Sequence, residues 1–153
     1  HRDRALPERI ALAIYLRQFA DELELHDPTA AGRVDVDAAE HLAIVFDRTH
    51  LHRVLWNLLV NALRQASASA GAVRLIATPA MTGAIELHIV DDGAGIDESL
   101  RGQVFEPFFT THGSGTGLGL YIARELCEAN GAQLELLNST SGAHFRVTAK
   151  GSP

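Results

Sequence analysis

The chain has 153 residues, of which 46% are hydrophobic and 21% are charged, and its formal net charge is −6. That size and composition fit one globular domain with a core of its own, and the negative charge argues against a surface for nucleic acid or for an anionic membrane. We recognise no apolar stretch as long as a membrane span and no signal peptide, and the single Cys127 cannot form an internal disulfide, so we expect a cytoplasmic domain with a buried core thiol.

Hydrophobic periodicity and chain-breaking residues predict one domain of helices and strands over residues 1–153. In chain order, the expected elements are a helix over 12–25, strands over 34–37 and 42–46, a helix from Asp47 or Thr49 to about Ala66, paired strands over 73–78 and 85–90, a short helix from Asp97, a helix from about Gly117 to Asn130, and strands over 134–137 and 144–148.

The predicted helix that ends near Ala66 has two chemically different faces. Its apolar residues recur every three or four positions and form a buried stripe, while Arg53, Asn57, Asn61 and Arg64 share a narrow arc of another face. An asparagine offers an uncharged carbonyl oxygen that suits a Mg²⁺ ion already bound to phosphate, and Arg64 would bind the phosphate chain itself. The alternative is an ordinary solvent-exposed helix face.

The segment Asp91-Asp-Gly93-Ala-Gly95-Ile96 directly follows the predicted strand over 85–90. A carboxylate at that point would accept a hydrogen bond from the amino group of adenine and would repel the carbonyl oxygen of guanine, so Asp91 would select adenine. The glycines would let the backbone pass close to the base. A hairpin turn is the alternative, but the acidic residues after Ile96 favour a helix start and no returning strand follows.

Aromatic residues gather between the two glycine-rich motifs. The string Phe105-Glu-Pro-Phe-Phe-Thr110-Thr111-His112 holds three of the six phenylalanines, and glycines follow it. Such a loop could close over a nucleotide as a lid, with its aromatic rings as a latch. The alternative is a small apolar cluster beneath a long loop.

The glycine run Gly113-Ser-Gly115-Thr116-Gly117-Leu118-Gly119 stands at the start of the predicted helix that ends near Asn130. Glycine lets backbone N–H groups approach an anion closely, and the helix start adds partial positive charge, so the run predicts a phosphate-binding loop. It is neither a P-loop, which needs a Lys-Ser or Lys-Thr pair, nor a dinucleotide motif with glycine at the first, third and sixth positions. A different class of nucleotide site is therefore indicated.

Four motifs in this order carry a family resemblance. Asn57-Leu-Leu-Val-Asn61, Asp91-Asp-Gly93-Ala-Gly95, Phe105-Glu-Pro-Phe108 and Gly115-Thr-Gly117-Leu-Gly119 resemble the N, G1, F and G2 boxes of bacterial two-component sensor histidine kinases. The segment before Val34 and the aromatic string are most similar to the nitrogen- and pilus-regulating branch of these kinases. The resemblance implies their catalytic ATP-binding domain, a Bergerat-type (GHKL, HATPase_c) α/β sandwich with helices on one face of a mixed, mostly antiparallel sheet. Residues 1–9 would be a linker and residues 97–114 the ATP lid.

The resemblance also implies the roles of individual residues. The catalytic residues would be Asn57, Asn61 and Arg64, with Asn61 as the ligand of Mg²⁺ and Asp91 on adenine. Related kinases often have lysine where His112 stands, and a histidine is only partly charged near neutral pH, which weakens the expectation that His112 binds phosphate. The residues expected to contact ATP are Asn57, Asn61, Arg64, Asp91, Gly93, Gly95, Ile96, Phe105, Thr110, Thr111, His112, Gly115, Thr116, Gly117, Leu118 and Gly119.

Asn57 distinguishes between two reactions. Hydrolysing ATPases of this superfamily have a glutamate at the corresponding position as the general base for water, and an amide cannot accept that proton. A neutral imidazole brings its own lone pair, so phosphoryl transfer to histidine mainly needs the γ-phosphate to be positioned and its charge stabilised. We therefore expect transfer to a partner histidine and slow hydrolysis.

The phosphoacceptor helix of such kinases would carry a histidine followed by an acidic residue. We recognise no such helix in the chain, so we expect the acceptor histidine on a separate helical dimerisation domain. A response regulator would be reached through the full-length kinase, and the isolated domain would be a monomer without direct contact to membrane or nucleic acid. Asn57 argues against a serine-phosphorylating relative and against a gyrase- or chaperone-type ATPase, and a non-catalytic ADP or ATP sensor is the other alternative.

We do not expect His50 and His52 to bind a metal, because residues two apart on a helix diverge.

Overall fold

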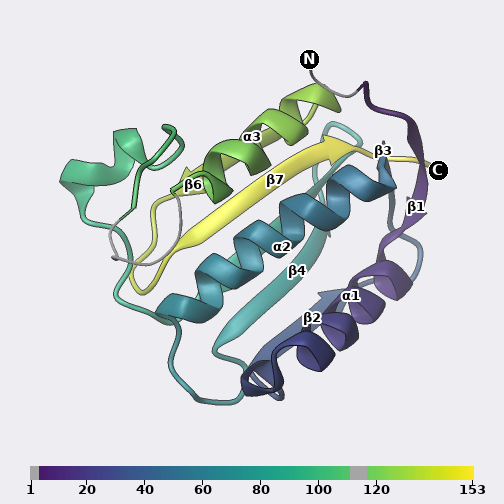
Figure 1. Cartoon of the computed structure of the whole chain (residues 1–153). Helices are drawn as coiled ribbons and strands as arrows, with labels where there is room; N and C mark the ends of the chain where they lie inside the picture. Colours follow the sequence, from purple (N-terminus) through teal and green to yellow (C-terminus); the bar gives the residue numbers. More distant parts are fainter. Residues whose placement is uncertain (1–3, 111–116) are drawn as a thin grey trace.

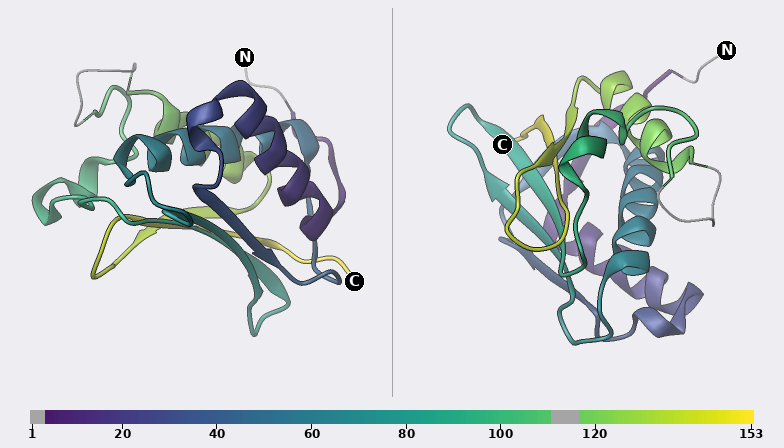
Figure 2. Two further views of the ribbon diagram at one scale, coloured as in Figure 1. Left: turned by 90° about the horizontal axis from the view of Figure 1, so that it is seen from below. Right: turned by 90° about the vertical axis from the view of Figure 1, so that its left-hand side faces the viewer.

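The computed structural model describes residues 4–110 and 117–153. Helices α1 (Leu12–His26), α2 (Arg48–Gln65) and α3 (Gly119–Ala129) cover one face of a curved sheet, and the other face is open (Figures 1 and 2). This two-layer arrangement confirms the predicted α/β sandwich. Within the described residues, no helix combines the length and the apolar character needed to cross a membrane.

The main sheet has five strands in the order β2-β4-β5-β7-β6. Strand β2 runs parallel to β4, and the other neighbours are antiparallel, which confirms the mixed, mostly antiparallel sheet. The bounds of its strands are Val34–Ala38 (β2), Val73–Pro79 (β4), Ala84–Asp91 (β5), Gln133–Leu137 (β6) and His144–Lys150 (β7).

Strand β5 shows how the sheet presents a polar group to the helices. Its residues alternate, so that Ile85, Leu87, Ile89 and Asp91 are buried and the residues between them are less so. Asp91 is the last member of the buried row, at the end of the strand. The alternation therefore places this carboxylate under the helix layer rather than on the open face.

A second, two-stranded sheet lies beside the main one and includes residues 7–9 of the segment predicted to be a linker. Strand β1 (Pro7–Ala11) pairs antiparallel with β3 (Ala43–Asp47), and a bridge from Ile44 to Gly151 ties β3 to the end of the chain. Three of the five β1 residues are exposed and only Ile10 is buried. Without alternation there is no local signal for a strand, because β1 exists through its distant partner.

The helices follow the predicted apolar spacing. In α2 the fully buried side chains include Leu51, Leu55, Leu58 and Leu59, and Asp47 caps the helix by accepting from the His50 N–H at 2.9 Å. Cys127 on α3 is fully buried, and burial raises the pKa of its thiol to about 12, which confirms a packed core thiol.

Two short elements refine the prediction around the glycine motifs. The helix expected from Asp97 is a 3₁₀ helix, Glu98–Gln103, with the Asp97 carboxylate accepting from the Ser99 N–H at 2.9 Å. Helix α3 begins at Gly119 rather than Gly117, because Gly117 has a φ of +75°, a left-handed conformation that cannot continue into the helix. A further 3₁₀ turn, Pro28–Ala30, follows α1.

Candidate functional site

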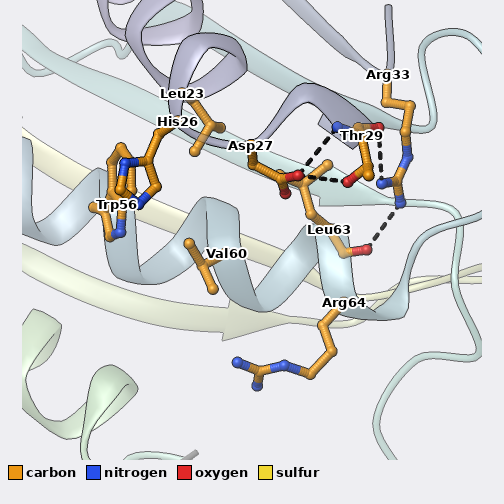
Figure 3. A pocket seen from close by; sticks show the side chains of 9 residues that line it. All are labelled: Leu23, His26, Asp27, Thr29, Arg33, Trp56, Val60, Leu63 and Arg64. Atoms are coloured by element: carbon orange, nitrogen blue, oxygen red, sulfur yellow. Dashed lines mark hydrogen bonds between the residues drawn. The ribbon is translucent and has the colours of Figure 1, made fainter. Parts of the chain in front are cut away.

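The polar arc of α2 faces the start of α3. The side-chain nitrogen of Asn57 donates to the Gly119 carbonyl oxygen at 3.1 Å, so the amide lies against the first residue of α3. Asn57 and Asn61 are half-buried, and Arg64 is exposed. In Figure 3 the Arg64 side chain extends away from α1. The three predicted residues therefore come from one helix, and Asn57 meets the segment predicted to bind phosphate.

Asp91 at the end of β5 is a buried, partly satisfied acid. The residue is only 3% exposed, and its Oδ1 accepts from the N–H groups of Gly93 at 2.8 Å and Ala143 at 3.2 Å. Burial raises the pKa of Asp91, the two N–H groups partly offset that effect, and the neighbouring charge of Asp92 adds to it. Since both bonds use Oδ1, Oδ2 is the oxygen that could accept from an adenine amino group.

The glycines after Asp91 are required by close backbone contacts. A Cβ atom on Gly93 would collide with the carbonyl oxygen of Gln65, the last residue of α2. Gly95 has a φ of +81°, and a Cβ there would lie 3.1 Å from the Gly142 carbonyl oxygen. The Gly93 contact brings the loop after β5 directly against the end of α2, the helix that carries Asn61, and the Gly95 contact brings it against the turn before β7.

The turn before β7 contacts Asp91, and sequence reasoning missed this contact. Gly142, in the turn before β7, has a φ of +66°, and a Cβ atom on it would collide with the Asp91 carbonyl oxygen. The next residue, Ala143, makes two hydrogen bonds with Asp91, accepting from the Asp91 N–H at 3.0 Å and donating to its carboxylate. Only the pairing of β5 with β7 places these residues together, so no local pattern could have indicated them.

The first part of the predicted lid is anchored to the domain. The Phe105 ring packs edge-on against Phe145 of β7, with ring centres 6.0 Å apart, and the Arg124 guanidinium lies 5.4 Å above the Phe105 ring. Ile96 also packs against the core. This is the apolar cluster considered as the alternative for the aromatic string, and contact of Phe105 or Ile96 with a nucleotide stays a prediction.

Phe108 and Gly117 form a tight junction at the base of this loop. The Phe108 N–H donates to the Gly117 carbonyl oxygen at 2.8 Å, and a Cβ atom on Gly117 would lie 2.5 Å from the Phe108 carbonyl carbon. Phe108 itself has a φ of +69°, and it is 73% exposed. A strained and exposed phenylalanine at such a junction fits a role in binding rather than in folding.

Several predicted contacts lie outside the described residues. Thr111, His112, Gly115 and Thr116 fall in the segment that the structure does not describe, so their contacts with ATP stay predictions. Among the described ones, Thr110 is exposed and Leu118 and Gly119 are half-buried at the start of α3.

A groove of about 490 Å³ lies on another side of α2, towards α1 (Figure 3). Two of its polar side chains already have partners: Asp27 accepts from Thr29, and Arg33 donates to the Leu63 carbonyl oxygen at 2.9 Å. It is lined by Leu23, His26, Asp27, Thr29, Arg33, Trp56, Val60, Leu63 and Arg64. Apart from Arg64, the groove contains none of the predicted site residues.

The histidines near α2 have structural partners. His50 lies 3.0 Å from the Asn130 amide nitrogen, and His52 lies 3.0 Å from Glu22 and stacks on Trp56. No group of three or more histidine, cysteine, aspartate or glutamate side chains in residues 4–110 and 117–153 is arranged to hold a metal ion.

His26 is the one histidine of the described chain that an acidic residue follows. It is the last residue of α1, and Asp27 caps the next turn. The pair therefore ends a helix, whereas the phosphoacceptor expected for such kinases lies within one.

Comparison with known families gives one family model. The model described as "Histidine kinase-, DNA gyrase B-, and HSP90-like ATPase" (HATPase_c) matches residues 46–152. That range contains α2, the loop after β5 and α3, and hence every residue predicted to contact ATP.

Curated relatives are sensor kinases. Sensor protein kinase PilS of Pseudomonas aeruginosa is 35% identical over 158 residues, which cover 96% of this chain and 28% of PilS. Signal transduction histidine-protein kinase AtoS of Escherichia coli is 39% identical over 140 residues, which cover 88% of this chain and 23% of AtoS. The chain thus spans about a quarter of the length of these relatives.

Solved structures of similar shape are histidine kinases. Full-length ShkA in complex with AMPPNP superposes with a TM-score of 0.80 and 26% identity, over 99% of this chain and 32% of ShkA. The nucleotide-free catalytic domain of histidine kinase ThkA superposes with a TM-score of 0.79 and 26% identity, over 97% of this chain and 99% of that domain. Nearly the whole of this chain therefore corresponds to one catalytic domain.

Proposed function

This chain belongs to the HATPase_c family and is an ATP-binding catalytic domain of the sensor histidine kinase type, and from that premise we propose how its residues bind ATP and transfer phosphate. The proposed reaction moves the γ-phosphoryl group of ATP to a histidine on a separate helical domain. The observation that supports it best is the bond from the Asn57 amide to the Gly119 carbonyl oxygen.

That bond favours a kinase over a hydrolase. A glutamate at position 57 would bring a carboxylate against the Gly119 carbonyl, where two acceptors repel, whereas the asparagine amide donates there. Asn57 also cannot act as a general base for water. We therefore propose that Asn57 orients the phosphate loop, while the attacking lone pair comes from the acceptor imidazole. The new N–P bond forms at the γ-phosphorus as its bond to the bridging oxygen breaks and ADP leaves.

The adenine half of the proposed site is built on Asp91. Its carboxylate is buried and held through Oδ1, which supports a fixed acceptor at Oδ2 for the adenine amino group. The close approach of Gly93 to the end of α2 leaves no room for a side chain there. Both features support recognition of a flat base with an exocyclic amino group, hence adenine rather than guanine.

The phosphate half is built on α2 and the start of α3. We propose that Arg64 binds the phosphate chain and that Asn61 holds Mg²⁺, whose chemistry when bound is to neutralise phosphate charge. The donor set fits this ion, because a neutral amide oxygen beside phosphate oxygens and water is a hard, oxygen-only environment. Arg64 is exposed and directed away from α1, so its guanidinium is available to an anion (Figure 3).

The proposed partners belong to the longer sensor kinase of which this chain would be the catalytic domain. The acceptor histidine lies on a dimerisation domain of the same kinase, a response regulator receives the phosphate from it, and the domain works in the cytoplasm. Similarity to sensor kinases that are several times longer than this chain supports these assignments. The chain itself contributes ATP binding and catalysis, and the isolated domain is a monomer.

Phosphotransfer tests the proposal directly. The chain is mixed with the purified helical domain that carries the acceptor histidine, and with Mg²⁺ and ATP labelled at the γ-phosphate. We expect acid-labile, alkali-stable label on the helical domain and little free phosphate in its absence. Rapid ATP hydrolysis by the chain alone would favour an ATPase, and tight ATP binding without any labelled histidine would favour a nucleotide sensor.

A further inference from the structure

Asp92, in the loop after β5, is hydrogen-bonded to the segment that follows α2. The two carboxylate oxygens of Asp92 accept separately from one residue, Oδ1 from the Ser67 N–H at 2.7 Å and Oδ2 from the Ser67 hydroxyl at 2.5 Å. Ser67 lies just beyond the last turn of α2, and Asp92 lies one residue after Asp91. This two-point contact joins the helix of Asn61 and Arg64 to the strand end of Asp91.

Arg33 holds the other side of the same segment. Its guanidinium donates to the carbonyl oxygens of Ser67 at 3.0 Å, Leu63 at 2.9 Å and Ala66 at 3.3 Å (Figure 3 shows the bond to Leu63). Leu63 lies in the last turn of α2, and Ala66 and Ser67 directly follow the helix. Carbonyls at a helix end have no partner within the helix, so this cation both satisfies them and orients them. The N–H, hydroxyl and carbonyl of Ser67 are thus all engaged, by Asp92 and Arg33.

The backbone beside the Asp92–Ser67 contact is closely packed against the end of α2. Gly93 packs so closely on the Gln65 carbonyl oxygen that no Cβ atom fits between them. Three consecutive residues therefore make three different contacts. Asp91 faces the helix layer, Asp92 accepts hydrogen bonds from Ser67, and Gly93 packs on the end of α2. Hydrogen bonds from the side chain and the backbone of Ser67 lower the pKa of Asp92, so its carboxylate is charged throughout the neutral range.

We propose that Asp92 is a positioning residue for the nucleotide, which acts through Ser67 to fix the distance between the adenine-binding Asp91 and the phosphate-binding helix α2. This inference rests on the proposed function. ATP must contact Asp91 at one end and α2 at the other, so it binds best when the two supports are already aligned. Adenosine needs only the Asp91 end. Loss of the Asp92–Ser67 contact therefore weakens the ligand that spans both supports and spares the one that does not.

The test compares two ligands on matched variants. Calorimetry measures Mg²⁺-ATP, and an NMR titration measures the weaker adenosine. In Asp92→Ala, which loses both bonds, we expect Mg²⁺-ATP to bind about tenfold more weakly, and in Ser67→Ala, which keeps the bond from the backbone N–H, about threefold more weakly. Adenosine affinity should change less than about twofold in both variants. Asp92→Asn rescues binding to within about threefold of the native chain, because its Oδ1 still accepts from the Ser67 N–H and its amide can donate to the hydroxyl.

A serine in the same loop supplies the matched control. Ser69 is exposed, and its backbone N–H, which donates to the Ser67 hydroxyl oxygen at 3.2 Å, is kept in Ser69→Ala. This variant removes one hydroxyl beside the Asp92–Ser67 contact without touching the contact itself. We expect both affinities to stay unchanged.

The outcomes separate this inference from the proposed function. An equal loss of adenosine and Mg²⁺-ATP in Asp92→Ala and Ser67→Ala would mean that the contact serves only to fold the Asp91 loop, and would overturn the inference alone. Unchanged binding of both ligands in the two variants would do the same. A native chain that binds neither ligand would reject the proposed function together with the inference.

Discussion

The two ends of the α2–α3 helix pair differ sharply in how their polar groups are satisfied. At one end, which we term the closed end, Asp47, His50 and Asn130 bond to one another in the interior. At the other, the open end, Asn57 donates to Gly119, Asn61 is half-buried and Arg64 is exposed. The helices are therefore antiparallel and joined by internal hydrogen bonds at one end, while the residues proposed to bind ATP lie at the other.

The closed end is specified by the hydrogen bonds of Asn130. Its Oδ1 accepts from the Asp47 N–H at 2.8 Å, so its amide nitrogen must be the donor, to the Leu126 carbonyl oxygen at 2.8 Å and to His50 Nδ1 at 3.0 Å. The Asp47 carboxylate in turn accepts from the N–H of Leu6, the residue before β1, at 2.8 Å. Three elements far apart in the chain meet in this network, and every bond is internal.

The open end has the opposite character. Asp91 is buried with its pKa raised, Phe108 is strained and exposed, and Arg64 is exposed where an anion can reach it. A buried acid and a strained backbone destabilise a fold unless a ligand uses them. We therefore propose that the closed end carries the stability of the helix pair and that the open end carries its binding. Four predictions test this division.

The largest effect is expected from Asp91→Asn at the open end. Loss of the charged acceptor for the adenine amino group should weaken ATP binding about 100-fold, or about 2.7 kcal/mol. The folded-state pKa of Asp91 is raised, so its contribution to stability is present below the unfolded pKa and lost as pH rises through the folded pKa. The neutral variant should therefore be no less stable than the native chain near neutral pH. Calorimetry and thermal unfolding check both statements, with the exposed Asp37→Asn as control.

The reverse pattern is expected from Asn130→Ala at the closed end. The buried N–H of Asp47 and the His50 ring lose their partner, at about 2 kcal/mol, which lowers the melting temperature by about 4–8 °C. ATP affinity should change less than about threefold, because Asn57 and Gly119 are at the other end. The exposed Asn138→Ala is the matched control for thermal unfolding. A large loss of ATP affinity with unchanged stability would contradict the division between the ends.

A smaller effect at the closed end depends on pH. Burial alone would raise the pKa of Asp47, but the N–H groups of Leu6 and His50 and the nearby His50 ring outweigh it and the pKa is lowered. Stability from Asp47 is thus present above its unfolded pKa, about 3.9, and is lost as pH falls towards the folded value. Denaturant unfolding from about pH 6 down to about pH 2 should show a shallower loss for Asp47→Asn than for the native chain. Equal slopes would show that this carboxylate does not couple to folding.

The smallest effect is expected from Arg124→Ala, beside the base of the lid. The variant loses the contact of a guanidinium with the Phe105 ring, which at an exposed site contributes about 0.5 kcal/mol. ATP affinity should stay within about twofold. Arg17→Ala, which removes only an exposed pair with Glu40, is the control for a lost surface charge. A destabilisation well above about 1 kcal/mol in Arg124→Ala would mean that the lid base belongs to the core.

Local patterns in the sequence determined most of the elements and the chemical types of the site. Apolar spacing marks α1 and α2, alternation marks β5, and glycine and acidic residues mark the motifs after β5 and before α3. Each of these signals acts within a few residues, through side-chain direction or backbone freedom. The resemblance to sensor kinases came from such motifs, and the family comparison confirms it.

Contacts between distant segments decided the rest. Strand β1 exists because β3 pairs with it, and Ala143 meets Asp91 because β7 lies beside β5. Asp92 meets Ser67 because the antiparallel pair of β4 and β5, which separates them in the sequence, brings them together at one end. Asn130 meets Asp47 although 83 positions separate them. A single sequence records none of these pairings, because hydrogen bonds between remote segments depend on the packing of the whole domain rather than on any local periodicity. The motifs in the sequence therefore predicted the class of ligand, whereas the tertiary structure decided which distant residues hold each part of the candidate site in place.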